Sequence, residues 1–362
     1  MSSDSKLKIL AILVEPANYT LDLIRNFYDP RGISHVFIKQ DSLAGKANSD
    51  FFALDSLPIA RRVRKIYELL KSFAIFNLNG YTGITCFLFI LLNVVFFKKP
   101  FSIDSDTELI IPHNPIKRCI KWVWLHFLFT REYCYGFAGG SFGHKDLFLH
   151  YGMSESRIFL APMVVDNAKY KRLREVDCFE RGRPFRFGYV GRLVELKQVD
   201  SVISAFKTLV DNGINAELEI IGDGPLRKKL EEMSEGLSVN FFGSIYGNDK
   251  IRAIHRLDCL VLYSHYESWG LVVNEALASG VPVIVSDRVG ARRDLVEGES
   301  PTGLVAKWND IDDLAAKLWQ MVVDVGTRRN MANDAVARMS TWDYGLYAKG
   351  YDSFLEKTGA LA

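Results

Sequence analysis

The chain has 362 residues, of which 48% are hydrophobic and 24% are charged; this excludes a disordered chain or a coiled coil, and the length favours two domains. The formal net charge of +2 is too small to indicate nucleic acid as a partner. The five cysteines form no C-x-x-C pair, which predicts core thiols in a reducing compartment and no structural zinc: Cys86, Cys119, Cys134, Cys178 and Cys259.

The N-terminal half alternates between predicted strands and helices. Its polar start, residues 1–8, lacks the apolar segment of a signal peptide, so we expect a cytoplasmic protein. Residues 84–97 are apolar over about 14 positions, too few to span a bilayer, and predict a buried helix. Strands are predicted at 8–14, 35–38, 73–77, 100–103, 109–111 and 135–138, with a helix at 59–71.

The second half has a clearer βαβ pattern, which predicts a doubly wound parallel sheet with its ligand site at the strands' carboxyl ends. A polar stretch at 165–186 separates the halves, and we place the hinge there. Strands are predicted at 187–190, 218–221, 239–242, 259–262 and 281–285, and helices at 199–212, 225–234, 249–256, 271–279, 312–323 and 346–357.

Two carboxylates eight residues apart, Glu267 and Glu275, lie on either side of a predicted helix start. Gly280 is well placed to end this helix. The amides of Gly270, Leu271 and Val272 would leave free N–H groups at its N-terminus, an arrangement that binds anions.

This segment resembles the E-x7-E motif of family 4 glycosyltransferases, which have the GT-B fold and transfer sugars with retention. Further resemblances to the family occur in the same order over about residues 185–330, at 187–197, 220–225, 289–291 and 303–305. The resemblance implies an α/β chain with two Rossmann-like, doubly wound domains that face each other across a cleft. Residues 1–168 and a crossover helix in 346–362 would bind the acceptor, and residues 169–345 would bind the nucleotide sugar.

By the same resemblance, Glu267 would hydrogen-bond the transferred sugar and Glu275 would bind the ribose. Arg192 and Lys197 would hold the diphosphate together with the amides of Gly270, Leu271 and Val272, supplying positive charge where the leaving group becomes negative. Gly222 and Gly224 would border the nucleoside, although these glycines could instead serve only to form turns. Gln198 departs from the family, which usually has glycine after the lysine.

The N-terminal half matches the family less well. We expect Asp104 or Asp106 at the position where the family has a histidine, orienting the acceptor hydroxyl; a solvated turn is the alternative. The same pair forms a D-x-D string that could hold a divalent metal, as in the other large glycosyltransferase fold. The remaining acceptor or cleft candidates are Asn18, Tyr19, Gly139 and Gly140.

Residues 117–131 contain four bases, no acid and several aromatic residues. Such a helix can lie on an anionic membrane, which would suit a lipid-linked acceptor and a peripheral position on the inner face of the cell membrane. A core helix with a basic solvent edge is the alternative.

We therefore predict a retaining hexosyltransferase that needs no metal or other cofactor. It would move a sugar from a nucleoside diphosphate sugar, such as a UDP-sugar, to the hydroxyl of a saccharide or lipid-linked saccharide. Bacterial surface polysaccharide, lipopolysaccharide or glycolipid biosynthesis is the expected setting. The alternatives are an epimerase or phosphorylase on the same fold, and a non-catalytic protein that binds nucleotide sugars or serves as a scaffold.

Overall fold

The computed structural model describes residues 7–40, 52–171 and 183–360. The chain forms two compact units: unit 1 comprises 1–165 and 344–362, and unit 2 comprises 166–343. The sequence predicted domain borders between residues 168 and 169 and between residues 345 and 346. Most of the predicted hinge, together with Cys178, lies outside the described residues.

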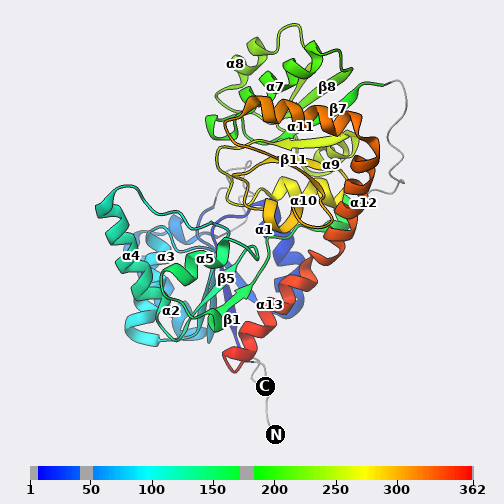
Figure 1. Cartoon of the computed structure of the whole chain (residues 1–362). Helices are drawn as coiled ribbons and strands as arrows, with labels where there is room; N and C mark the ends of the chain where they lie inside the picture. Colours follow the sequence, from blue (N-terminus) through cyan, green and yellow to red (C-terminus); the bar gives the residue numbers. More distant parts are fainter. Residues whose placement is uncertain (1–6, 41–51, 172–182, 361–362) are drawn as a thin grey trace. The chain divides into compact units, whose positions relative to one another are not determined.

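Unit 1 contains a parallel six-stranded sheet with the order β2-β1-β3-β4-β5-β6. Figure 1 labels β1 and β5 of this sheet. The four inner strands are short and mostly buried, as expected for a sheet covered on both faces, whereas the edge strands β2 and β6 are only partly covered. The strands are β1 (Ile9–Leu13), β2 (Ser34–Phe37), β3 (Ile75–Leu78), β4 (Phe101–Ser105), β5 (Cys134–Ala138) and β6 (Ile158–Leu160).

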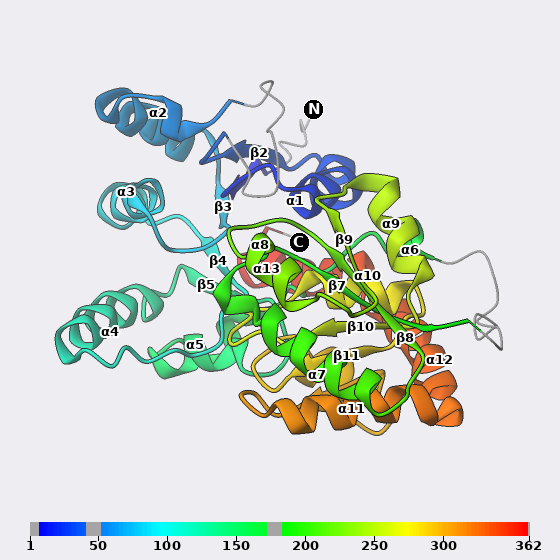
Figure 2. The same cartoon turned by 90° about the horizontal axis from the view of Figure 1, so that it is seen from above.

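Helices cover both faces of this sheet. Figure 2 shows α2, α3 and α4 side by side on one face, while α1 and α13 lie on the other. The helices are α1 (Asn18–Leu23), η1 (Ile24–Tyr28), α2 (Ile59–Ser72), α3 (Ile84–Leu92), η4 (Asn93–Phe97), α4 (Pro115–Phe129), α5 (His144–His150) and α13 (Tyr344–Lys357). Short helical turns occur at η2 (Asp29–Arg31), η3 (Leu54–Ser56) and η5 (Glu155–Arg157).

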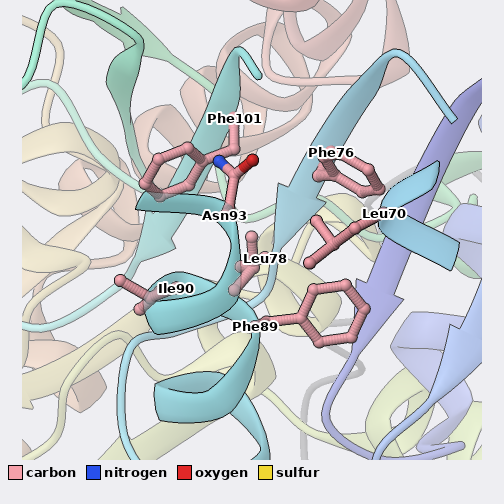
Figure 3. Close-up of a pocket in the computed structure, with 7 residues that line it drawn as sticks. All are labelled: Leu70, Phe76, Leu78, Phe89, Ile90, Asn93 and Phe101. Carbon is pink, nitrogen blue, oxygen red and sulfur yellow. The ribbon is translucent and has the colours of Figure 1, made fainter. Parts of the chain in front are cut away.

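The inner side of α3 fixes this helix to the sheet (Figure 3). Phe89 and Ile90 pack with Leu70 of α2 and with side chains of β3 and β4. Asn93 ends the contact: its amide donates to the Lys99 carbonyl at 2.9 Å and accepts from the Lys99 N–H at 3.1 Å. Only this side of the predicted buried helix is covered, because Ile84, Phe87, Leu91 and Val95 are between 41 and 59% exposed. The prediction of a wholly buried helix was therefore wrong.

The last helix, α13, packs on β6 and η1 within unit 1. A Cβ at Gly350 would lie 1.7 Å from the Leu160 carbonyl oxygen, so only glycine permits this approach. The Tyr351 hydroxyl donates to Asn77 Oδ1 at 2.6 Å, which ties the helix to β3 through a buried hydrogen bond.

Unit 2 contains a second parallel sheet, with the order β12-β11-β10-β7-β8-β9. Its strands are β7 (Phe185–Val190), β8 (Ala216–Ile221), β9 (Val239–Gly243), β10 (Cys259–Leu262), β11 (Val283–Ser286) and β12 (Gly303–Ala306). Its helices are α6 (Asn167–Tyr170), η6 (Glu195–Lys197), α7 (Val199–Asp211), α8 (Arg227–Met233), α9 (Gly247–Arg256), α10 (Leu271–Ala278), η7 (Arg292–Val296), α11 (Ile311–Val323) and α12 (Val325–Thr341). The predicted α/β class with two doubly wound sheets is confirmed.

Several local predictions were wrong. Residues 109–111 form no strand: they lead into α4, Pro112 follows them and has no N–H to donate to a sheet, and Ile110 and Ile111 are exposed. Cys119 is exposed on α4, so it is not a core thiol. Among the described helices, none is both long and apolar enough to cross a membrane.

Candidate functional site

The order of strands in unit 2 determines where a ligand site can form. Strand β7 pairs with β8 on one side and β10 on the other. From β7 the chain first adds β8 and β9, and later adds β10, β11 and β12 in the opposite direction. In doubly wound sheets, ligands bind at the carboxyl ends of the strands where the order reverses. Here that point lies between the loops that follow β7 and β10.

The loop after β7 is held tightly against the loop after β8. Leu193 N–H donates to the Asp223 carbonyl at 2.9 Å, and Gly191 N–H donates to Ile221 at 2.9 Å. A Cβ at Gly222 would lie 1.8 Å from the Gly191 carbonyl oxygen, and one at Gly224 would lie 2.4 Å from that of Leu193. Both glycines therefore allow the two loops to approach each other closely. Their contact with a nucleoside stays a prediction.

The loop after β10 is fixed in a similar way. Gly290 N–H donates to the Glu267 carbonyl at 2.9 Å, and a Cβ at Gly290 would lie 1.9 Å from the Ser268 carbonyl oxygen. The Trp269 indole is buried, donates to Asn274 Oδ1 at 2.7 Å and stacks on Trp342. Trp269 thus anchors the loop from inside, while the Glu267 side chain stays partly exposed.

Two predicted site residues meet at the point of strand reversal. Lys197, at the end of η6, donates to Glu267 Oε2, and both side chains are about one-fifth exposed. The His265 N–H donates to the Leu196 carbonyl at 2.9 Å, which joins the same two loops through the backbone. A partly exposed lysine and carboxylate can each turn toward a ligand, the lysine toward an anion and the carboxylate toward hydroxyl groups.

The N-terminus of α10 lies next to this pair. Gly270 precedes the helix with a φ of 96°, and its Cβ position would be 3.2 Å from Glu267 Cγ. No side chain of the described residues caps the helix start, which leaves the N–H groups around Leu271 and Val272 available to an anion. Arg192 is exposed, and its guanidinium makes no hydrogen bond or ion pair within the described ranges, so this cation is also available.

Glu275 lies on the second turn of α10, where it is almost completely buried. The Lys250 ammonium of α9 donates to Oε1 at 2.7 Å and lies 2.5 Å from Oε2, and the Tyr170 hydroxyl donates to Oε1 at 2.9 Å. Lys250 and Tyr170 were not predicted as site residues, because nothing in the local sequence shows that α6 and α9 bring them to this carboxylate. They offset the cost of burying the charge and fix its orientation.

In unit 1 the strand order reverses between β1 and β3. The predicted carboxylates, Asp104 and Asp106, lie at the carboxyl end of the next strand, β4. Asp104 is inside β4, paired with Phe137 of β5, and its Oδ1 is buried with no hydrogen-bond partner among the described residues. It is therefore not a solvated turn residue. Burial raises the pKa of Asp104 to about 7, and interactions with the side chains of Asn79 and Ser102 only partly offset this.

The other unit 1 candidates gather near this carboxylate. Burial raises the pKa of Tyr19, and Asp106 lies close enough to raise it further. A Cβ at Gly139 would be 3.2 Å from the Asp106 Cα, so this glycine allows β4 and β5 to end in close contact. Gly140 is buried beside it, whereas Asn18 is exposed at the start of α1. In the described part of the chain, no group of three or more His, Cys, Asp or Glu residues is placed to hold a metal.

A layer of buried tyrosines lies behind Asp104. The hydroxyls of Tyr28 and Tyr347 are 3.1 Å apart, and burial raises the pKa of both, with Asp104 adding to the shift. Asn77 accepts from Tyr351 and donates to Ser102 Oγ at 2.7 Å. These hydrogen bonds keep the floor of the site rigid. His144 is buried at the start of α5.

The sequence of unit 2 is similar to known glycosyltransferases. Residues 177–338 match the family model described as glycosyl transferases group 1. The chain is 30% identical over 158 residues to the sulfoquinovosyl transferase SQD2 of Arabidopsis thaliana, covering 43% of this chain and 30% of that protein. It is 29% identical over 160 residues to the capsular polysaccharide biosynthesis glycosyltransferase CapM of Staphylococcus aureus, covering 43% and 41%. The chain thus matches less than half the length of these relatives.

The likeness to solved structures extends over both units. The crystal structure of Anabaena Alr3699/HepE in complex with UDP-glucose superimposes with a TM-score of 0.74 at 16% identity, covering 97% of this chain and all of that one. At this identity the likeness shows the fold alone. The chain therefore has the GT-B fold, and its segment from 177 to 338 is similar to the glycosyl transferases group 1 family.

Proposed function

We propose that the protein transfers a sugar from a nucleoside diphosphate sugar to an acceptor hydroxyl, with retention of configuration at the anomeric carbon. The observation that carries this proposal is the Lys197–Glu267 pair beside the uncapped N-terminus of α10, at the point of strand reversal in unit 2. The family match over the same segment supports it.

The donor would bind to unit 2. Arg192 and the amides around Leu271 and Val272 hold the diphosphate, because no described residue pairs with this guanidinium or caps these N–H groups with its side chain. Glu275, fixed by Lys250, accepts hydrogen bonds from the ribose. Glu267 binds hydroxyls of the sugar, and Lys197 stabilises the negative charge that develops on the departing phosphate.

In the transfer step, the bond between the anomeric carbon and the phosphate oxygen breaks as the acceptor oxygen bonds to that carbon on the same face. The acceptor proton passes to the departing phosphate oxygen, so no protein group has to accept it. Asp104 and Asp106 orient the acceptor hydroxyl; a pKa of about 7 leaves Asp104 divided between its two protonation states at neutral pH.

We further propose that the reaction needs no divalent metal, because the lysine, the arginine and the helix N-terminus supply the positive charge. Transfer should continue in the presence of a chelator, and the NMR coupling at the anomeric carbon of the product should match that of the donor. Loss of transfer with the chelator and its return with manganese would instead favour the D-x-D alternative at Asp104 and Asp106. An inverted product would contradict retention.

For the acceptor, we propose a saccharide or lipid-linked saccharide of bacterial surface polysaccharide or glycolipid synthesis, presented at the inner face of the cell membrane. The name of CapM and the basic helix at 117–131 support this. Lys117 and Arg118 are exposed at the start of α4, where they can contact anionic lipid headgroups. Faster extension of a lipid-linked acceptor than of the same saccharide free in solution is the expected result.

A further inference from the structure

Helix α3 has an exposed face that carries no polar side chain. Ile84, Phe87 and Leu91 of α3 and Val95 of the adjoining η4 repeat at intervals of three and four residues, and each is more than 40% exposed. The buried residues of α3, such as Phe89 and Ile90, lie on the opposite side. No charged residue occurs between 82 and 97. A surface helix of a globular protein normally carries polar residues on its outer face, so this apolar face indicates a partner other than water.

Helix α4 repeats the arrangement. Ile116, Ile120, Val123 and Phe127 are exposed at intervals of three and four residues. The buried residues, Leu125, Leu128 and Phe129, occupy the opposite side of this helix. α4 therefore packs on unit 1 with one apolar side and exposes another.

The two faces adjoin each other. The rings of Phe87 on α3 and Trp124 on α4 lie 5.2 Å apart, and Figure 2 shows the two helices side by side on one face of the unit 1 sheet. A shallow hollow of about 410 Å³ on α4 is lined by Ile120, Val123, Trp124, Phe127 and the thiol of Cys119. We call the exposed apolar residues of α3, η4 and α4 together the α3–α4 face.

The chain segments that form the α3–α4 face, together with α2, contain mostly positive charges. Residues 59–99 contain seven Lys or Arg and a single acid, and residues 115–131 contain four bases and no acid. Lys98, Lys117 and Arg118 are exposed at the ends of η4 and α4. An apolar face with bases around it and few acids matches the anionic headgroups and acyl chains of a lipid leaflet.

We propose that the α3–α4 face docks on an anionic membrane surface, with the apolar residues of α3 and η4 inserted among the lipids and the bases of α4 against the headgroups. This deepens the proposed membrane contact of 117–131, because it assigns the apolar contribution to a second helix. From Ile84 to Phe97 the helical segment is about 21 Å long at 1.5 Å per residue, short of the roughly 30 Å of a bilayer core. It therefore lies in one leaflet.

A second copy of the chain fits this face less well. In a symmetric dimer the same patch meets itself, so the bases of one copy would lie near those of the other. Few acids nearby could balance that charge, whereas anionic lipids attract it.

The test is sedimentation of the full chain with vesicles of equimolar phosphatidylglycerol and phosphatidylcholine, at low and high salt. Wild type should bind these vesicles and bind pure phosphatidylcholine much less. Leu91→Gln/Val95→Gln should weaken binding by at least tenfold at both salt concentrations, because it removes apolar insertion. Lys117→Gln/Arg118→Gln should weaken it by roughly fivefold for each base at low salt and much less at high salt. Val336→Gln, a similarly exposed apolar residue on α12 of unit 2, is the matched control and should bind like wild type.

A fluorophore on Cys119 gives a second readout. Cys86, Cys134 and Cys259 are buried, and Cys178→Ser removes the thiol whose exposure the structure does not describe. The label should shift to shorter wavelength on anionic vesicles. Wild type that fails to bind, a Leu91→Gln/Val95→Gln variant that binds as well as wild type, or a chain that dimerises through this face in size-exclusion chromatography would overturn the proposal. Donor-induced thermal stabilisation without vesicles tests the glycosyl-transfer proposal separately, and these variants should leave it unchanged.

Discussion

The buried Asp104 carboxyl should make the stability of the protein fall as the pH rises. Its pKa is about 7 in the folded chain against an ordinary value of 3.8. The folded state therefore holds the proton more tightly than the unfolded state, and the free energy of unfolding decreases between about pH 4 and pH 7. The shift corresponds to about 4 kcal/mol at most, from about 1.4 kcal/mol for each pKa unit.

Asp104→Asn keeps the size of the side chain and removes its charge. We expect the variant to gain stability relative to wild type as the pH rises, by about 2 to 3 kcal/mol between pH 5 and pH 8. Urea unfolding at these two pH values measures this, with the fluorescence of Trp122 and Trp124 reporting on unit 1. Glu356→Gln, an exposed carboxylate on α13, is the control and should show no such gain. If the stability of the Asp104→Asn variant relative to wild type is the same at both pH values, the assignment of Asp104 as a desolvated carboxyl is refuted.

Two further predictions concern unit 2. Lys250→Met leaves the buried Glu275 without its cation. The variant should bind the donor about tenfold more weakly in calorimetry, with little change in kcat. Unchanged affinity would show that Lys250 does not position this carboxylate. Gly222→Ala should lower the free energy of unfolding by about 2 kcal/mol or more, because its Cβ would collide with the Gly191 carbonyl oxygen. The control is Gly213→Ala, which is also at positive φ but in open space and should cost about 1 kcal/mol. Equal losses for the two alanine variants in urea unfolding would contradict the close approach of the two loops.

Unit 2 could be predicted closely from the sequence because its constraints are local. Gly222 and Gly290 are required where one backbone approaches another, and such positions leave a short, recognisable pattern in the chain. The start of α10 was predicted correctly for the same reason, since Gly270 adopts a positive φ just before the helix. Lys250 was missed because its link to Glu275 depends on how α9 packs against α10.

Unit 1 was harder to predict because the roles of its residues depend on which side chains are exposed and which are buried. The apolar residues of α3 resemble a core helix in sequence, and only the packed structure shows that one side is uncovered. Asp104 was expected just beyond a strand, yet β4 continues through it to Ser105. Hydrophobicity predicted where the strands and helices lie but not which of their faces other elements cover.

The most direct test of the account is thermal unfolding of wild type and Glu275→Ala with UDP-, GDP-, ADP- and dTDP-sugars. We expect the sugars of one nucleotide to raise the midpoint of wild type by about 5 °C or more at saturating concentration, and to leave the variant unchanged. That result would support donor binding in unit 2 at the carboxylate held by Lys250 and Tyr170. Stabilisation by none of the sugars, or equal stabilisation of both proteins, would contradict it.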